Sequence, residues 1–169
     1  MAVQFGAFGE IEHWEPNPRR EPMKIHEDGS FEVIVLQLDV PSPRTGKIYN
    51  SQDIKRLIND PSFKHRVEGG FMTGEYSPRF RDSINRMMEV RLERVCAQYK
   101  NIRIQDGELL AELIPFGPFS DALVGKVYQR DFDVAMRATV RTVPINNVYD
   151  VAGLISIDVV TPFPVDKRY

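Results

Sequence analysis

Histidine and cysteine are the side chains that most often carry nucleophilic catalysis or hold a transition metal, and this sequence contains few of either. There are three histidines, His13, His26 and His65, and one cysteine, Cys96. None stands at ligand spacing from another, so we predict no metal centre built from histidine or cysteine. His65 lies in a basic stretch, Ser62–Arg66, which we interpret as an exposed turn. Cys96 is interpreted as a buried, inert thiol.

Two other stretches have residue types that suit binding. Gly69–Glu75 is rich in glycine but lacks the Gly-Lys-Ser/Thr ending of a phosphate loop. We therefore predict no nucleotide or other cofactor, and interpret the stretch as a tight turn leading into a structural carboxylate, Glu75. The second stretch is an alternation that places four residues on one strand face: Ala135, Arg137, Thr139 and Arg141.

Two arginines on one face of a strand have two interpretations. They form either a solvated, ion-paired surface or a site that holds an anion or a developing oxyanion. The spacing alone favours the solvated surface, facing outward.

Strands and short helices are expected to position these residues. Strands are predicted at Phe31–Val40, Met88–Glu93 (with a bulge near Arg94 and a continuation through Ile104), Leu109–Ile114, Phe132–Val143 and Val151–Thr161, and helices at Gln52–Asn59 and Ser120–Gln129. Asp106-Gly107 is a hairpin signal. Because no regular strand–helix–strand alternation occurs, we predict an α+β fold. Its core would be a mainly antiparallel sheet or barrel with two or three inserted helices.

Residues 1–29 differ from the rest of the chain. They hold three of the twelve prolines and the only tryptophan, and they follow no helical or strand period. We predict an extended N-terminal arm over 1–29 and one folded domain over 30–169. Phe5, Phe8 and Trp14 are candidate contacts, either with the chain's own domain or with a neighbouring subunit.

Composition excludes several classes of protein. The 169 residues are 42% hydrophobic and 27% charged, and 22 basic against 24 acidic side chains leave a net charge of −2. These values fit one globular domain and exclude a disordered chain. They give no basic surface for nucleic acid. No apolar run is long enough for a membrane span, and the N-terminal residues lack the basic and apolar regions by which a secretory signal would be visible. One cysteine excludes a disulfide scaffold and fits a reducing cytoplasm.

Seven segments, taken in order, resemble the prohead (capsid maturation) proteases of tailed phages, which share a fold with herpesvirus assemblin. The segments are Gly46–Asn50, Gly74–Pro78, Arg94–Ala97, Leu109–Pro115, Gly117–Leu123, Phe132–Ala138 and Ile155–Pro162. The resemblance covers about residues 30–165 and implies an assemblin-like α+β fold.

The resemblance also implies where catalytic residues would stand. One family motif resembles Gly-Glu-x-x-His-Pro, whose histidine is the general base. The other resembles Ser-x-Arg-Gly or Ser-x-Arg-Ala, whose serine is the nucleophile and whose arginine lies beside the oxyanion. Here Ser77 precedes the proline and Ala135 occupies the nucleophile position, while Glu75 and Arg137 match. Because a serine needs a base and a methyl group cannot attack a carbonyl, we predict a degenerate site with no catalytic residue.

Two alternatives stay open. In one, Ala135 is an engineered replacement of a serine. In the other, the register is shifted, and Ser77 or Thr139 is the nucleophile with His65 as base.

The sequence therefore predicts a virion or head-morphogenesis protein, made in the host cytoplasm. It would be a capsid-associated, decoration or head–tail junction component that acts through contacts with capsid, portal or tail-junction proteins in an oligomeric assembly. The alternative function is an active serine-type maturation protease that cleaves scaffold and capsid proteins. A third is an unrelated binding module of the host cytoplasm.

Overall fold

The structure, a computed structural model, describes residues 25–41, 46–78, 84–127, 132–140 and 146–161. Its strands are β1 (Phe31–Gln37), β2 (Ile48–Tyr49), β3 (Thr73–Glu75), β4 (Val95–Gln105), β5 (Glu108–Pro115), β6 (Asp133–Val140), β7 (Val148–Tyr149) and β8 (Val151–Val160). Its helices are α1 (Ser51–Asn59), α2 (Pro61–Glu68), α3 (Ile84–Met88) and α4 (Ser120–Val127), with a 3₁₀ turn at Leu92–Arg94.

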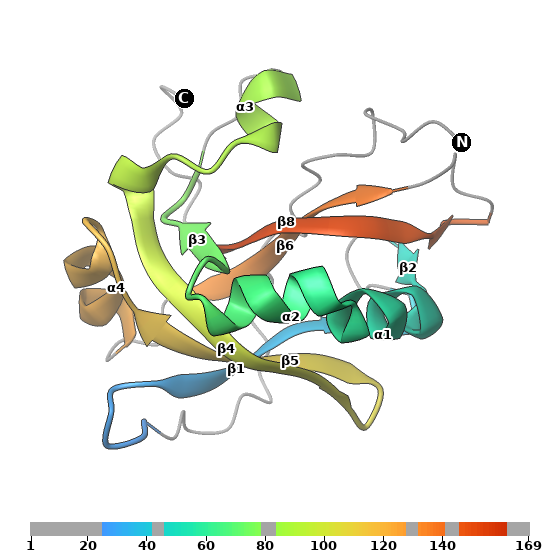
Figure 1. The fold of residues 1–169 in the computed structure, drawn as a ribbon, viewed down its shortest axis with the longest axis horizontal. Helices are drawn as coiled ribbons and strands as arrows, with labels where there is room; N and C mark the ends of the chain where they lie inside the picture. The colour runs from blue at the N-terminus through green and yellow to red at the C-terminus, as the bar shows by residue number, and fades with distance from the viewer. Residues whose placement is uncertain (1–24, 42–45, 79–83, 128–131, 141–145, 162–169) are drawn as a thin grey trace.

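The strands curve around one core as a half-barrel (Figure 1). Four of them form a sheet in the order β1-β5-β4-β3, and β6 pairs with β8. A parallel bridge between Tyr76 and Val159 connects the end of β3 to β8. β6 then lies beside β1, where the rings of Phe31 and Phe132 meet edge to face at 5.8 Å. All pairings except β2–β7 and this bridge are antiparallel, which confirms the predicted α+β class.

The core forms because the strands alternate. In β1, Phe31, Val33 and Val35 are buried, whereas Glu32 and Ile34 are exposed. The hairpin between β4 and β5 turns at Asp106-Gly107, as predicted. Both turn residues have positive φ (52° and 76°), as a type I′ turn requires.

Four α-helices are described, and two of them, α2 and α3, have no counterpart among the predicted ranges. For α2 the reason is a proline. The prediction ended a helix at Asp60-Pro61, and α1 does end at Asn59. However, Pro61 begins α2, where its fixed φ and missing N–H cost nothing, and the side chain of Asp60 caps the new helix at Ser62. His65 therefore lies on a helix rather than in a turn, with its side chain exposed as predicted.

The predicted strand at Met88–Glu93 is wrong. Met88 ends α3 and Leu92 begins the 3₁₀ turn, and both side chains are exposed despite their alternation. The main chain here bonds to buried side chains instead of a neighbouring strand: Glu89 O accepts from Arg137 and Arg91 N donates to Glu75. The strand begins only at Val95.

The expected bulge lies two residues beyond Arg94. Gly74 pairs with Ala97 and Glu75 pairs with Val95, so Cys96 is the extra residue in β4.

Candidate functional site

The residues of the resembled catalytic motifs meet where β8 lies between β6 and the end of β3. Across the β6–β8 ladder, Ala135 is opposite Asp158 and Arg137 is opposite Ser156. Opposite residues of an antiparallel pair share a face of the sheet. Ala135, which the resemblance assigns to the nucleophile position, therefore stands directly across from a carboxylate.

Arg137 is the centre of this layer, and it is completely buried. Its Nε donates to Ser156 Oγ at 2.8 Å and to Asp158 Oδ2 at 3.0 Å, and its Nη2 donates to Glu75 Oε2 at 3.0 Å. Nη1 donates to three main-chain carbonyls, those of Arg86 (3.4 Å), Met87 (3.1 Å) and Glu89 (2.7 Å). All three guanidinium nitrogens are thus bound inside the protein.

The expectation of an outward, solvated face on β6 is therefore wrong. Ala135 and Arg137 are both 0% exposed, and Thr139 is only partly exposed. The reason is that β6 is covered on both sides. Val134 and Met136 pack into the apolar core, and the carbonyls at the end of α3 and just after it cover Arg137. Arg141 lies outside the described residues.

Glu75 is the second hub. It is 0% exposed and accepts hydrogen bonds from Arg86, from Arg137 and from the N–H of Arg91 at 3.2 Å. Gly74 allows β3 to lie close to β8, because a Cβ at this position would stand 2.8 Å from the carbonyl carbon of Ile157 and closer still to its oxygen. The main-chain N–H of Glu75 donates to Asp158 Oδ1 at 3.1 Å, which ties the backbone of β3 to the carboxylate of Asp158 on β8.

The four charges of this layer balance, since Glu75 and Asp158 face Arg86 and Arg137. Burial by itself raises the pKa of Glu75, but the hydrogen bonds from Arg86 and Arg137 outweigh burial and lower this pKa below its ordinary value. For Asp158, burial prevails over its bonds with Arg137, and its pKa is raised. The hydrogen bond to Glu75 raises the pKa of Arg86. We call these four residues and Ser156 the buried ion network.

Ser77 stands beside the buried ion network but is bonded elsewhere. Its N–H donates to Val159 O at 2.7 Å, its hydroxyl lies 3.4 Å from Thr161 Oγ1, and its φ is +43°. Thr139 pairs with Gly153, six residues from Val159 along β8. At roughly 3.3 Å per residue, the backbones at Ser77 and Thr139 attach to β8 about 20 Å apart.

Neither Ser77 nor Thr139 has a histidine among its hydrogen-bond partners in the described part of the chain. His65 and His26 are both exposed, on α2 and before β1. The shifted-register alternative, with Ser77 or Thr139 served by His65, is not supported by any contact in these ranges.

Three members of the buried ion network were missed in the sequence: Arg86, Ser156 and Asp158. Ser156 and Asp158 carried a usable signal, because they are polar residues at alternate positions of the otherwise apolar segment Val151–Val160. Arg86 carried none. Phe5, Phe8 and Trp14 lie outside the described residues.

Within the described ranges, no three His, Cys, Asp or Glu side chains are grouped to hold a metal ion. Nor does any helix in those ranges have the length and apolar character to cross a membrane.

The half-barrel has the fold of a phage capsid protease. The solved structure of the bacteriophage T4 capsid assembly protease, gp21, has a TM-score of 0.63 with this chain at 17% sequence identity, and the match covers 79% of this chain and 82% of gp21. The sequence model of the Peptidase S80 family matches residues 10–161, so the chain belongs to that family. This confirms the resemblance to phage prohead proteases. A search of curated proteins finds no match.

Proposed function

We propose that this chain is a phage head-assembly protein that keeps the prohead-protease fold and has lost serine-protease chemistry. It acts through contacts with capsid proteins, and with portal or tail-junction proteins, as a component of the virion. Membership of the Peptidase S80 family and the likeness to a capsid assembly protease support the setting.

One observation carries the loss of chemistry. The nucleophile position is the methyl group of Ala135, 0% exposed, beside an arginine whose guanidinium is fully used in a charge-balanced network. An oxyanion site needs donors left free for the developing charge, and a nucleophile needs access to a carbonyl. The residue at the base position, Ser77, has a hydroxyl that cannot act as a base near neutral pH.

Cleavage assays test this proposal. The purified protein is incubated with procapsid proteins, and the products are identified by mass spectrometry. We expect no site-specific cleavage from the wild type, and none from Ala135→Ser, because a restored hydroxyl still lacks a base. Cleavage by the wild type that disappears in Ser77→Ala or in the isosteric Thr139→Val would contradict the proposal.

A second experiment addresses location. Purified particles should contain full-length chains in a fixed ratio to the capsid protein. A chain that is absent from mature particles, or present only as fragments, would instead fit a protease consumed during maturation.

The second candidate function is an active maturation protease that cleaves scaffold and capsid proteins. The left-handed backbone of Ser77 favours it, since a non-glycine residue held at φ +43° is a conformation that gathers at functional sites. A fluorophosphonate probe distinguishes the two functions, because only an activated serine reacts with it. Labelling of Ser77 would establish the enzyme, and an unlabelled chain would support the head-assembly protein.

A further inference from the structure

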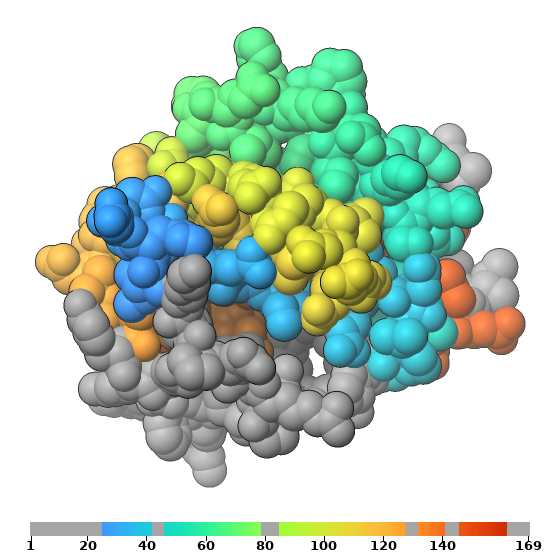
Figure 2. Space-filling model, turned by 90° about the horizontal axis from the view of Figure 1, so that it is seen from below, coloured from blue at the N-terminus to red at the C-terminus, as the bar shows by residue number. Residues whose placement is uncertain are grey.

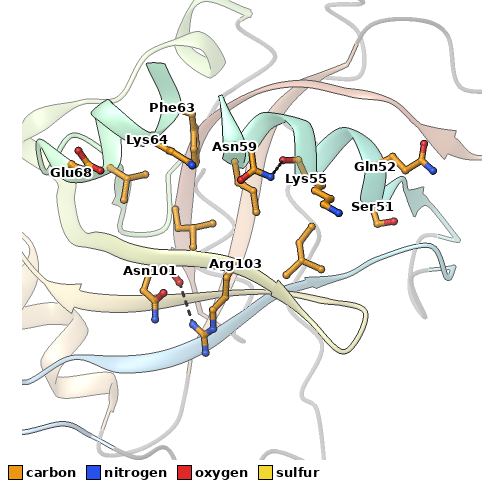
Figure 3. Close-up of a pocket in the computed structure, with 13 residues that line it drawn as sticks. Ser51, Gln52, Lys55, Asn59, Phe63, Lys64, Glu68, Asn101 and Arg103 are labelled. Carbon is orange, nitrogen blue, oxygen red and sulfur yellow. Dashed lines mark hydrogen bonds between the residues drawn. The ribbon is translucent and has the colours of Figure 1, made fainter. Parts of the chain in front are cut away.

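A groove unrelated to the buried ion network runs between helices α1 and α2 and the outer part of β4 (Figure 3). Its volume is about 770 Å³, within the range of ligand-binding clefts. Four partly buried apolar side chains line it: Ile58, Val67, Ile102 and Ile104. Lys55 and Lys64, both exposed, stand on the helices at its rim, together with one acidic residue, Glu68.

The strand that lines this groove has an open edge. Pairing of β4 with β3 ends at Gln98, and the N–H of Tyr99 then donates to Met72 O. In the described parts of the chain, no strand pairs with Lys100–Gln105 on that side, while β5 occupies the other side. An open edge beside an apolar groove suits an extended segment. The register shift after Lys100, with Asn101 at φ 50°, limits any such segment to a short one.

The chain itself supplies a segment of matching chemistry in the residues before Ile25. Glu10-Ile-Glu-His-Trp-Glu15 contains three glutamates, no lysine or arginine, and two large apolar residues. Its acidic side chains complement the rim lysines, and Ile11 and Trp14 complement the apolar lining.

The segment can reach the groove. Asp28 is ion-paired with Lys100 at 3.0 Å, so the described chain begins beside β4, one residue from Asn101 of the groove lining. Figure 2 shows residues 25–31 (dark blue) on the same face of the molecule as β4 (yellow) and the helices (green). The nine residues between Glu15 and Ile25 span up to about 30 Å when extended, and the three prolines among them favour extension.

We propose that Glu10–Glu15 docks in the groove between α1, α2 and β4 of its own molecule. The glutamates face Lys55 and Lys64, and Ile11 and Trp14 cover the apolar lining. In this arrangement the arm lies beside the open edge of β4. This proposal does not depend on whether the chain cleaves proteins.

Trp14 reports on docking directly, because it is the only tryptophan in the chain. In the full-length protein, acrylamide should quench its fluorescence much less than that of free N-acetyltryptophanamide. The double charge reversal Lys55→Glu and Lys64→Glu should shift the docked–undocked equilibrium by roughly ten-fold toward the undocked arm and raise the quenching accordingly. The matched control is Arg91→Glu, which reverses an exposed charge that does not line the groove and should leave quenching unchanged.

A charge swap decides the question. Reversal of Glu10, Glu12 and Glu15 to lysine should also expose Trp14, and combining it with the two reversed groove lysines should restore protection. Each set of reversed charges alone should disrupt docking. Restored protection in the combined variant would therefore show that the glutamates and the lysines contact each other. Circular dichroism of each variant shows that the domain is folded.

Three outcomes would overturn the proposal. One is a wild-type Trp14 that is quenched like the free indole. Another is protection that is unaffected by the charge reversals. The third is protection that vanishes on dilution, which would place the arm on a neighbouring copy rather than on its own molecule.

Discussion

Two groups of ion pairs in this protein use the same residue types in opposite surroundings. The buried ion network holds Glu75, Arg86, Arg137 and Asp158 at 0–7% exposure. On the outer face of the sheet, Arg103 of β4 pairs with Glu32 of β1 across the intervening β5, with 30% and 48% of these side chains exposed. Water solvates the outer pair in the folded and the unfolded chain alike. Water does not reach the buried charges, so each of them depends on its charged partners in the folded protein.

Under the proposed function, this difference indicates what Arg137 does in place of catalysis. A catalytic arginine keeps donors free for a charge that appears only during reaction. Here the donors of Arg137 are bound by permanent partners, so the residue stabilises the joint between β6, β8 and β3. The proposed function therefore gives Arg137 a structural role instead of a catalytic one.

The largest effect is expected from breaking the buried ion network. Arg137→Met leaves Glu75 and Asp158 without their shared cation, and removing one partner of a buried ion group costs about 3–5 kcal/mol. Urea denaturation followed by circular dichroism measures the loss. If Arg137→Met gives no folded protein, Arg137→Lys is measured instead; it keeps the charge, loses the planar fork and should cost less. A loss equal to that of the outer-face variant Arg103→Met would refute the comparison.

A smaller loss should follow from separating the strands beside the buried ion network. In Gly74→Ala, the added methyl would overlap the main chain of Ile157, which cannot move without opening the β3–β8 contact. Overpacking of this kind costs about 1–3 kcal/mol. Gly125→Ala is the matched control. Nothing lies within 4 Å of that position in α4, so alanine should stabilise the helix by about 0.5–1 kcal/mol. If Gly74→Ala leaves the free energy of unfolding unchanged, the close approach of β3 and β8 is not required for stability.

The pH dependence of stability should also separate the two regions. Because the folded pKa of Glu75 lies below its ordinary 4.5, its contribution is fully present above pH 4.5 and is lost as pH falls through the lowered value. Glu75→Gln should therefore be less stable than wild type at neutral pH, and the difference should narrow below pH 4.5. Denaturation midpoints between neutral and acidic pH measure this.

The matched surface variant is Asp28→Asn. The pKa of Asp28 is also lowered, first by its hydrogen bonds with Ser30 and then by Lys100, but the side chain is exposed. Salt should weaken the part of the pH effect at Asp28 that comes from Lys100 and leave the effect at Glu75 nearly unchanged, because buried pairs are screened far less. Equal sensitivity to salt at both positions would show that water reaches Glu75.

The sequence predicted much of this architecture and little of the charge layer. An apolar, β-branched run predicted β1, alternation predicted β6, and Asp106-Gly107 predicted the hairpin, because these signals are local. The burial of Arg137 depends on the segment after α3, which covers β6 from about fifty residues away in the chain. The alternation of Met88, Val90 and Leu92 predicted a strand, but the main-chain carbonyls of this segment accept hydrogen bonds from Arg137 instead of pairing with a strand. The motif positions Glu75, Ser77, Ala135 and Arg137 were found by family resemblance, but their bonding depends on tertiary contacts.

The smallest effect is expected on the outer face. Arg103→Met removes an ion pair whose members are both partly solvated, and such pairs contribute about 0.2–1 kcal/mol. The methionine keeps most of the apolar stem of the side chain, so packing against the sheet should survive. Raising the salt concentration should weaken the wild-type pair and bring the two proteins closer in stability, whereas it should leave the deficit of Arg137→Met nearly unchanged. The salt dependence distinguishes the two ion pairs better than the size of either stability loss, because salt screening depends on how much solvent surrounds each pair.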